Sequence, residues 1–274
     1  MPPPDAAPPA REIAPAKLNL ALHVRGRRPD GRHDIETVFA FCTDGDRLSA
    51  IEAEEISLTI RGPFARKLHE SDNLVLDAAR SLAQASGWAK GAAIHLDKRL
   101  PVASGIGGGS ADAAAALRLL TSLWSVDPRF AAEVAPGLGS DVPACLLSLP
   151  VRGEGAGDVL TPIDLADLSG TPVLLVNSGA PLSTAEVFGD WDGVDRGPLG
   201  DWREGRNDLE APAIAQVPEI QDVLDWLRRC EGASFVRMSG SGATCFALFD
   251  DEAARDLAEE SVPGNWWRLA TFLR

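Results

Sequence analysis

A run of consecutive glycines leads directly into an alanine-rich stretch, and this segment constrains the fold more than any other. It reads Leu100-Pro-Val-Ala-Ser-Gly-Ile-Gly-Gly-Gly-Ser110-Ala-Asp-Ala-Ala, and a helix is predicted over 110–124. Glycines let the main chain turn its N–H groups inward, and the start of a helix adds unpaired N–H groups and a positive dipole end. The segment therefore predicts a phosphate-binding loop. A flexible connector with Ser110 as helix cap is the alternative.

Two common phosphate-binding motifs do not describe this loop. The chain contains no Gly-Lys dipeptide, which excludes a Walker A sequence. Gly105 and Gly107 match the first glycines of a dinucleotide-binding fingerprint, but Ser110 stands where the last glycine belongs. Neither motif therefore accounts for this predicted phosphate-binding loop.

The charge of the chain narrows its partners. The formal net charge is −14 over 274 residues, whereas a protein that follows a nucleic-acid backbone or an anionic membrane needs an excess of positive charge. We therefore expect neither nucleic acid nor membrane as a partner. Small anionic ligands stay compatible, because a pocket can be positive within an acidic protein.

The cysteines and the N-terminus indicate a cytoplasmic protein. Cys42, Cys145, Cys230 and Cys245 lie far apart and form no C-x-x-C pair, so we expect reduced thiols rather than a zinc site or disulfides. The first fifteen residues carry six prolines and no apolar core of a signal peptide, so they predict an extended tail. No stretch reaches the roughly 20 apolar residues of a membrane span.

Hydrophobic periodicity predicts a mixed α+β chain in two halves. Strands are expected over 17–24, 35–41, 47–53, 56–60, 92–96, 172–176, 234–236, 244–249 and 266–273. Helices are expected from a cap at 71–73 to residue 86, over 110–124, near residue 130, and over 183–188, 218–230 and 251–260. The glycines of 153–157 are the best candidate for a hinge between the halves.

Three further features carry possible chemistry, each with a plain structural alternative. Asp141 lies between small residues in Gly139-Ser-Asp-Val-Pro143, where it is either catalytic or part of a turn or helix cap. Lys17 is a lone charge at the head of an apolar strand, where it is either catalytic or an edge lysine. The glycines of Ser239-Gly-Ser-Gly-Ala-Thr244 form either a ligand loop or a hairpin turn.

Taken together, these segments resemble a known family. Pro15-Ala-Lys-Leu-Asn-Leu, the glycine loop from Pro101 and Ser239-Gly-Ser-Gly-Ala-Thr resemble, in order, the three signature motifs of the GHMP small-molecule kinases. Gly31-Arg-His-Asp-Ile, Asp72-Asn-Leu-Val, Lys98-Arg-Leu-Pro, Gly139-Ser-Asp-Val-Pro and Asn207-Asp-Leu-Glu are similar to the members that act on a cytidyl-diphosphate-linked methylerythritol. The resemblance runs from about Ala14 to Phe249.

The resemblance implies a fold and a domain organisation. We expect the α+β two-domain GHMP kinase fold, with a ribosomal-protein-S5-like N-terminal ATP-binding domain over 14–155. A ferredoxin-like C-terminal domain is expected over 156–274, after a disordered tail at 1–13. A homodimer is among the assemblies compatible with this fold.

The resemblance also implies a reaction, in which the ATP γ-phosphoryl group moves to a substrate hydroxyl. Such transfers depend on positioning and on electrostatic stabilisation. Asp141 would accept or orient the hydroxyl proton, and Lys17 would hold the carboxylate ionised and stabilise the transferring group. ATP and Mg²⁺ are the expected cofactors.

The nucleotide-binding residues carried over from the resemblance gather around the glycine loop. Asn73, Lys98 and Pro101 would lie near the adenine, and Ser110 would also contact Mg²⁺. The triphosphate would be cradled by Gly105, Ile106, Gly107, Gly108, Gly109 and Ser110. The other nucleotide-binding residues expected in this segment are Val102, Ala103, Ser104 and Ala111.

The acceptor substrate would meet a second set of residues. Asn19, His33 and Phe188 match family positions, with His33 at the cytosine edge and Phe188 stacked on the ring, although Phe188 is also compatible with ordinary core. The family usually has Tyr before that His, whereas this chain has Arg32 and no tyrosine at all. A planar guanidinium can stack on a base. Another GHMP kinase, for homoserine or mevalonate, and a non-catalytic nucleotide-binding regulator remain the alternatives.

Overall fold

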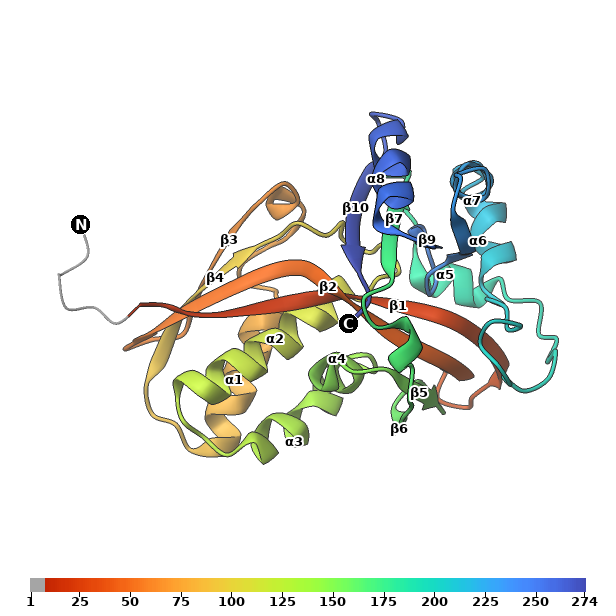
Figure 1. Ribbon diagram of the computed structural model, residues 1–274. Coiled ribbons are helices and arrows are strands. Elements are labelled where there is room, and N and C mark those ends of the chain that lie inside the picture. Colours follow the sequence, from red (N-terminus) through yellow and green to blue (C-terminus); the bar gives the residue numbers. More distant parts are fainter. Residues whose placement is uncertain (1–7) are drawn as a thin grey trace. The chain divides into compact units, whose positions relative to one another are not determined.

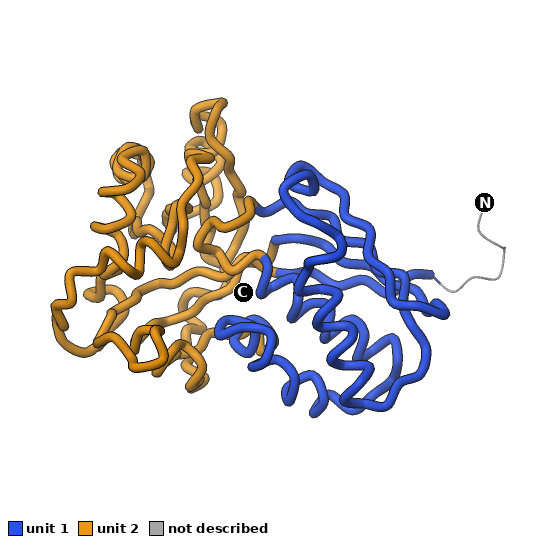
Figure 2. Tube along the Cα trace, turned by 180° about the vertical axis from the view of Figure 1, so that it is seen from behind, with its two compact units in different colours: residues 1–14, 45–100, 109–146 blue, residues 15–44, 101–108, 147–274 orange. Residues whose placement is uncertain are grey.

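A computed structural model describes residues 8–274 (Figure 1). It divides into two compact units that are interleaved along the chain (Figure 2). Of the described residues, unit 1 takes 8–14, 45–100 and 109–146, and unit 2 takes 15–44, 101–108 and 147–274. The long strands β1 (Ala10–Arg27) and β2 (His33–Ala53) contribute to both.

Unit 1 packs helices against a small sheet. The C-terminal half of β2 pairs antiparallel with β4 (Gly91–Asp97), and β3 (Ser57–Arg61) pairs parallel with β4. The helices are α1 (Leu74–Ser86), α2 (Gly108–Leu123), α3 (Pro128–Leu138) and α4 (Val142–Leu147). The small side chains of α2 are almost all buried, and that is why this helix is so rich in alanine.

Helix α1 begins where the sequence predicts it. The Asn73 side chain accepts a hydrogen bond from the Val75 N–H at 3.0 Å, and Gly87 ends the helix in the left-handed conformation. Buried Val75, Leu76 and Leu82 are part of its apolar stripe.

Unit 2 contains a four-stranded antiparallel sheet in the order β10-β7-β9-β8, built from β7 (Pro172–Asn177), β8 (Ala233–Met238), β9 (Cys245–Phe249) and β10 (Trp267–Phe272). Helix α7 (Glu219–Arg228) packs on β8 and β9, and α8 (Glu252–Ser261) packs on β7 and β10. This β-α-β-β-α-β order confirms the predicted ferredoxin-like arrangement.

Shorter elements complete unit 2. They are β5 (Val151–Glu154), β6 (Val159–Pro162), α5 (Thr184–Gly189) and α6 (Glu210–Gln216). Strands β5 and β6 form a hairpin, and β5 also pairs with β2. Gly155 and Gly157, in the segment predicted as a hinge, instead make the tight turn of this hairpin with positive φ angles.

The N-terminal strand and the second strand differ from the sequence prediction. Strand β1 begins at Ala10, so residues 10–13 of the predicted tail are ordered strand; residues 1–7 lie outside the described part. Arg118 stabilises this start by donating hydrogen bonds to the Glu12 carboxylate and the Ile13 carbonyl, each at 3.0 Å.

The predicted strands over 35–41 and 47–53 form the single strand β2. The Asp-Gly-Asp sequence between them is typical of a turn. Here the Asp44 carboxylate accepts a hydrogen bond from Thr271, and the Asp46 carboxylate accepts from the main chain at Arg99 and Leu100. Tertiary partners therefore hold these residues in an extended strand.

Candidate active site

The three signature segments converge in unit 2. The Lys17 N–H donates to the Ile106 carbonyl at 3.0 Å, and the Thr244 N–H donates to the Ser104 carbonyl at 3.1 Å. The Ser239 hydroxyl donates to the Gly105 carbonyl at 3.0 Å. Segments more than 80 residues apart in the chain thus meet through direct hydrogen bonds, as the order of the motifs predicts.

Lys17 lies on β1 and is only 4% exposed. Its ammonium group donates to Asn19 Oδ1 at 2.9 Å and lies 4.8 Å from the centre of the Phe39 ring. Asn19 Nδ2 in turn donates to the Thr37 hydroxyl at 2.7 Å, and its N–H donates to Ser239. Lys17 is therefore a buried, positioned cation rather than the edge lysine of the alternative interpretation.

Two glycines of the loop are required by close packing. Gly105 has φ +77°, and a Cβ there would lie 2.4 Å from the Ser239 carbonyl oxygen. Gly107 has φ +66°, and a Cβ would lie 3.2 Å from Lys17 Cβ and Cε. The glycines thus let the loop approach both Ser239 and Lys17, so the loop is not a mere flexible connector.

The rest of the predicted nucleotide loop is also tightly held. Ser104 donates its hydroxyl to the Pro101 carbonyl at 2.7 Å, and Ile106 is fully buried. Helix α2 begins at Gly108, so Gly109, Ser110 and Ala111 form its first turn. The first N–H groups of an α-helix lack partners within the helix and suit an anionic group.

In unit 1, Lys98 occupies a buried cluster with two carboxylates. Its ammonium lies 2.6 Å from Asp46 Oδ2 and 2.6 Å from Asp112 Oδ2, and all three side chains are at most 4% exposed. Burial would lower the pKa of Lys98, but the Asp112 and Asp46 charges outweigh it and raise that pKa. Burial raises the pKa of Asp112 well above its ordinary value, although Lys98 opposes the shift.

Asp141 precedes the short helix α4 in unit 1. Its carbonyl accepts the Cys145 N–H at 3.0 Å, which starts the helix. Arg118 on α2 donates to the Cys145 carbonyl at 2.8 Å and so anchors α4. Asp141 thus lies at a fixed helix start, as its alternative interpretation allows, and its pairing with Lys17 stays a prediction.

The residues predicted for the cytosine ring lie together in unit 2. The His33 ring packs against the Phe188 ring with centroids 5.0 Å apart. Arg32 is turned to Asp30, to which it donates at 2.9 Å, and its side chain is 56% exposed. The stacking role predicted for Arg32 therefore requires it to leave Asp30, and it stays a prediction.

The chain is similar to known proteins over most of its length. The GHMP kinases N terminal domain matches residues 73–148, and GHMP kinases C terminal matches residues 192–267. The chain is 53% identical to the 4-diphosphocytidyl-2-C-methyl-D-erythritol kinase of Rhizorhabdus wittichii, over 96% of this chain and 94% of that one. The enzyme of the same name from Novosphingobium aromaticivorans is 51% identical, over 96% and 93%.

The chain belongs to the 4-diphosphocytidyl-2-C-methyl-D-erythritol kinases. It is therefore a small-molecule kinase of the GHMP family, with ATP as its phosphoryl donor. Neither domain match reaches residue 155, so the predicted domain boundary there stays a prediction.

Solved structures agree with the fold of this kinase. A crystal structure of 4-(cytidine 5'-diphospho)-2C-methyl-D-erythritol kinase superposes with a TM-score of 0.83 at 33% identity, covering 96% of this chain and 98% of that one. Homoserine kinase from Cytophaga hutchinsonii gives a TM-score of 0.70 at 15% identity, covering 97% and 95%. The second likeness shows the shared GHMP fold alone.

Sequence reasoning missed two residues that contact the predicted site segments. Asn207 Nδ2 donates to the carbonyls of Met238 and Gly240, both at 2.8 Å, and so holds the third signature motif. The Asn207 motif itself was visible, but its role needed the fold. Trp191 packs its ring edge-on to His33 with centroids 5.8 Å apart. Its only signal in the sequence is its proximity to Phe188.

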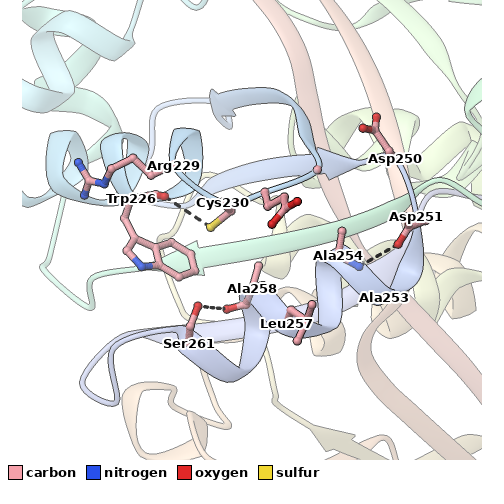
Figure 3. Close-up of a pocket in the computed structure, with 12 residues that line it drawn as sticks. Trp226, Arg229, Cys230, Asp250, Asp251, Ala253, Ala254, Leu257, Ala258 and Ser261 are labelled. Atoms are coloured by element: carbon pink, nitrogen blue, oxygen red, sulfur yellow. Dashed lines mark hydrogen bonds between the residues drawn. The ribbon is translucent and has the colours of Figure 1, made fainter.

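Two further observations concern the rest of the kinase. A hollow of about 750 Å³ lies beside α7 and α8 and is lined by Trp226, Cys230, Leu257 and their neighbours, none of them a predicted site residue (Figure 3). Within residues 8–274, no helix is long and apolar enough to cross a membrane.

Proposed function

We propose that this kinase transfers the γ-phosphoryl group of ATP to the 2-hydroxyl of 4-diphosphocytidyl-2-C-methyl-D-erythritol, in the non-mevalonate pathway to isoprenoid precursors. The observation that carries the proposal is the similarity over nearly the full length of several kinases named for this substrate. The convergence of the three signature segments on Lys17 and Gly105 supports it.

The chemistry divides between a proton and a phosphoryl group. The hydroxyl oxygen of the substrate forms a bond to the γ-phosphorus while the bond to the β,γ-bridging oxygen breaks, and ADP leaves. Asp141 accepts the hydroxyl proton or orients the hydroxyl toward the phosphorus. Lys17, held by Asn19, keeps Asp141 ionised and stabilises negative charge on the transferred group.

The glycine loop and the first turn of α2 are proposed to hold the triphosphate. Their backbone N–H groups suit phosphate oxygens, and the small residues admit close approach. Mg²⁺ would neutralise charge on the phosphates, with the Ser110 hydroxyl as the protein's ligand. Among the described residues no group of three or more His, Cys, Asp or Glu could hold a metal. This fits Mg²⁺, which keeps waters and phosphate oxygens as most of its ligands.

His33, Phe188, Arg32 and Asn19 are proposed to bind the cytidyl substrate. His33 would pair with the base edge, Phe188 and Arg32 would stack on the ring, and Asn19 would lie at the acceptor hydroxyl. A cytoplasmic location, a possible homodimer and the absence of nucleic-acid partners remain predictions from the sequence.

The test is ATP consumption by the purified kinase in the presence of candidate acceptors. We expect ADP formation only with 4-diphosphocytidyl-2-C-methyl-D-erythritol, and neither with mevalonate nor with homoserine. Phosphorus NMR of the product should show a new monoester on the 2-carbon. The Asp141→Asn variant controls for a contaminating kinase. Equal ADP formation without the cytidyl acceptor, or in that variant, would refute the proposal.

A further inference from the structure

The His33 ring is supported on two sides by aromatic rings of one short segment. Phe188 lies at the end of α5 with its ring tilted by 36° against His33. Trp191 follows the helix and meets the same ring edge-on, at an interplanar angle of 86°. Trp191 is only 4% exposed, so the residues around it hold its indole ring in place. The two rings together set the orientation of the imidazole.

The segment that carries these rings is tied back by Arg27. The Arg27 guanidinium donates to the Gly189 carbonyl at 2.9 Å and to the Trp191 carbonyl at 3.0 Å. The Gly189 carbonyl is at the C-terminal end of α5, where helix carbonyls lack partners within the helix, and the Trp191 carbonyl lies two residues beyond it. Gln216 donates to Asp190 at 2.7 Å and adds a second tie. Arg27 thus ties the segment that carries Phe188 and Trp191 to the end of β1, the strand that precedes His33.

One nitrogen at the edge of the His33 ring makes no hydrogen bond with the described residues. Nε2 is buried and has no hydrogen-bond partner among residues 8–274. Burial lowers the pKa of His33, and the charge of Arg27 lowers it further. The adjacent charges are already paired, Arg32 with Asp30 and Asp34 with Arg28. A neutral imidazole keeps one nitrogen as an acceptor, whereas an imidazolium has only donors.

We propose that Trp191 and Arg27 are positioning residues that hold the His33 ring, in its neutral form, for a pyrimidine that carries an exocyclic amino group. This rests on the proposed function, which places His33 at the base edge. At ring position 4, cytosine has an amino group that can donate to the acceptor nitrogen of His33. Uracil has a carbonyl oxygen there, which is itself an acceptor and cannot donate to that nitrogen. Arg27 and Trp191 act through His33 and need not touch the base.

The experiment compares the binding of CDP and UDP by calorimetry, without catalysis. We expect wild type to prefer CDP by at least about 10-fold, as a site built to hydrogen-bond an amino group should. Trp191→Leu and Arg27→Met should reduce the preference to below about threefold, with ATP affinity unchanged. Arg27 is exposed, so its variant keeps the test valid if Trp191→Leu does not fold.

Trp202→Leu is the matched control. Trp202 is a similarly buried tryptophan of unit 2, 6% exposed, that packs on Phe235 instead of His33. It should keep the CDP preference. A loss as large as in Trp191→Leu would mean that any loosening of the unit has the same effect, which would overturn the proposal. So would an unchanged preference in both Trp191→Leu and Arg27→Met.

An NMR titration of the His33 ring gives a readout that a merely structural role would not move. Removing the Arg27 charge should raise the pKa of His33, because the imidazolium is no longer opposed. An unchanged His33 pKa in Arg27→Met would contradict the claim that the Arg27 charge lowers it. If wild type prefers CDP but does not phosphorylate the methylerythritol acceptor, the proposed function fails while this inference stands. Equal binding of CDP and UDP by wild type would overturn this inference alone.

Discussion

Replacing Lys98 by methionine should destabilise the kinase more than any exposed ion-pair substitution. In the wild type one ammonium lies 2.6 Å from each of two carboxylates, and Lys98 is 2% exposed. Lys98→Met keeps most of the side-chain volume but leaves Asp46 and Asp112 facing each other without a cation. Breaking a buried ion pair by removing one partner costs about 3–5 kcal/mol.

A double-mutant cycle separates the charge from the packing. Asp112→Asn keeps an acceptor for Lys98 and leaves one cation with one carboxylate, so we expect a change within about 1 kcal/mol. In Lys98→Met/Asp112→Leu the only carboxylate left is Asp46, which still accepts from the main chain at Arg99 and Leu100. The double variant should therefore recover at least about half of the loss seen in Lys98→Met.

Thermal melts of the nucleotide-free protein measure these effects. A loss of 3–5 kcal/mol corresponds to a fall in Tm of roughly 6–20 °C for a chain of this size. A fall below about 3 °C in Lys98→Met, under about 1 kcal/mol on that scale, would refute the reasoning. The reasoning would also be refuted if Asp112→Asn lowered Tm as much as Lys98→Met, because the cluster has two carboxylates for one ammonium and can lose a carboxylate more easily.

The same cluster predicts a pH dependence with a definite sign. Burial raises the pKa of Asp112 above its ordinary 3.8, so the folded state holds this proton more tightly than the unfolded state. Stability from Asp112 is then fully present below pH 3.8 and is lost as the pH rises through the raised folded pKa. Asp112→Asn does not titrate, so its Tm relative to wild type should increase as the pH rises above about 4. A constant or shrinking difference would contradict the shift.

Substitutions at three positions test the site itself. Asp141→Asn should lower turnover by roughly 10²–10⁴-fold with little change in ATP affinity, and steady-state kinetics that retain more than about half of the turnover would contradict its role. Gly105→Ala should weaken ATP binding measured by titration, because its Cβ meets the Ser239 carbonyl at 2.4 Å; Gly170→Ala, with a similar positive φ but open space, should not. Arg32→Ala should raise KM for the cytidyl substrate about 5- to 100-fold, as expected for a lost stacking contact of about 1–3 kcal/mol, and Arg32→Tyr should restore much of it; an unchanged KM in the alanine variant would place Arg32 outside the pocket.

Local patterns were enough to predict much of the fold. The Asn73 cap, the apolar stripe of α1 and the alanine-rich α2 depend on neighbours within a few residues, and each is found where the sequence places it. The ferredoxin-like half followed from the resemblance, and its strand order confirms it. The helix features share one property, which is that short segments encode them.

The predictions failed where distant partners replaced local ones. Asp46 reads as part of a turn because its neighbours are Gly45 and Asp44, yet its hydrogen-bond partners are Lys98, Arg99 and Leu100. No period or spacing in the sequence connects positions 52–54 residues apart. The buried charge of Asp46 is satisfied only once β4 and the start of the loop are in place, and β2 then runs through without a turn.

In the candidate site, too, the sequence identifies the residues but not the distant contacts that hold them in place. The motifs identify Lys17 and Asp141 by residue type, but the residues that fix their surroundings lie outside the two motifs. Asn19, which orients Lys17, is held by Thr37 and Ser239, whereas helix α4, which follows Asp141, is anchored by Arg118. Arg118 also pins the start of β1, so one arginine in unit 1 supports both a strand and the helix of the proposed base. Residues of this supporting kind carry no chemical signature, and only the fold identifies them.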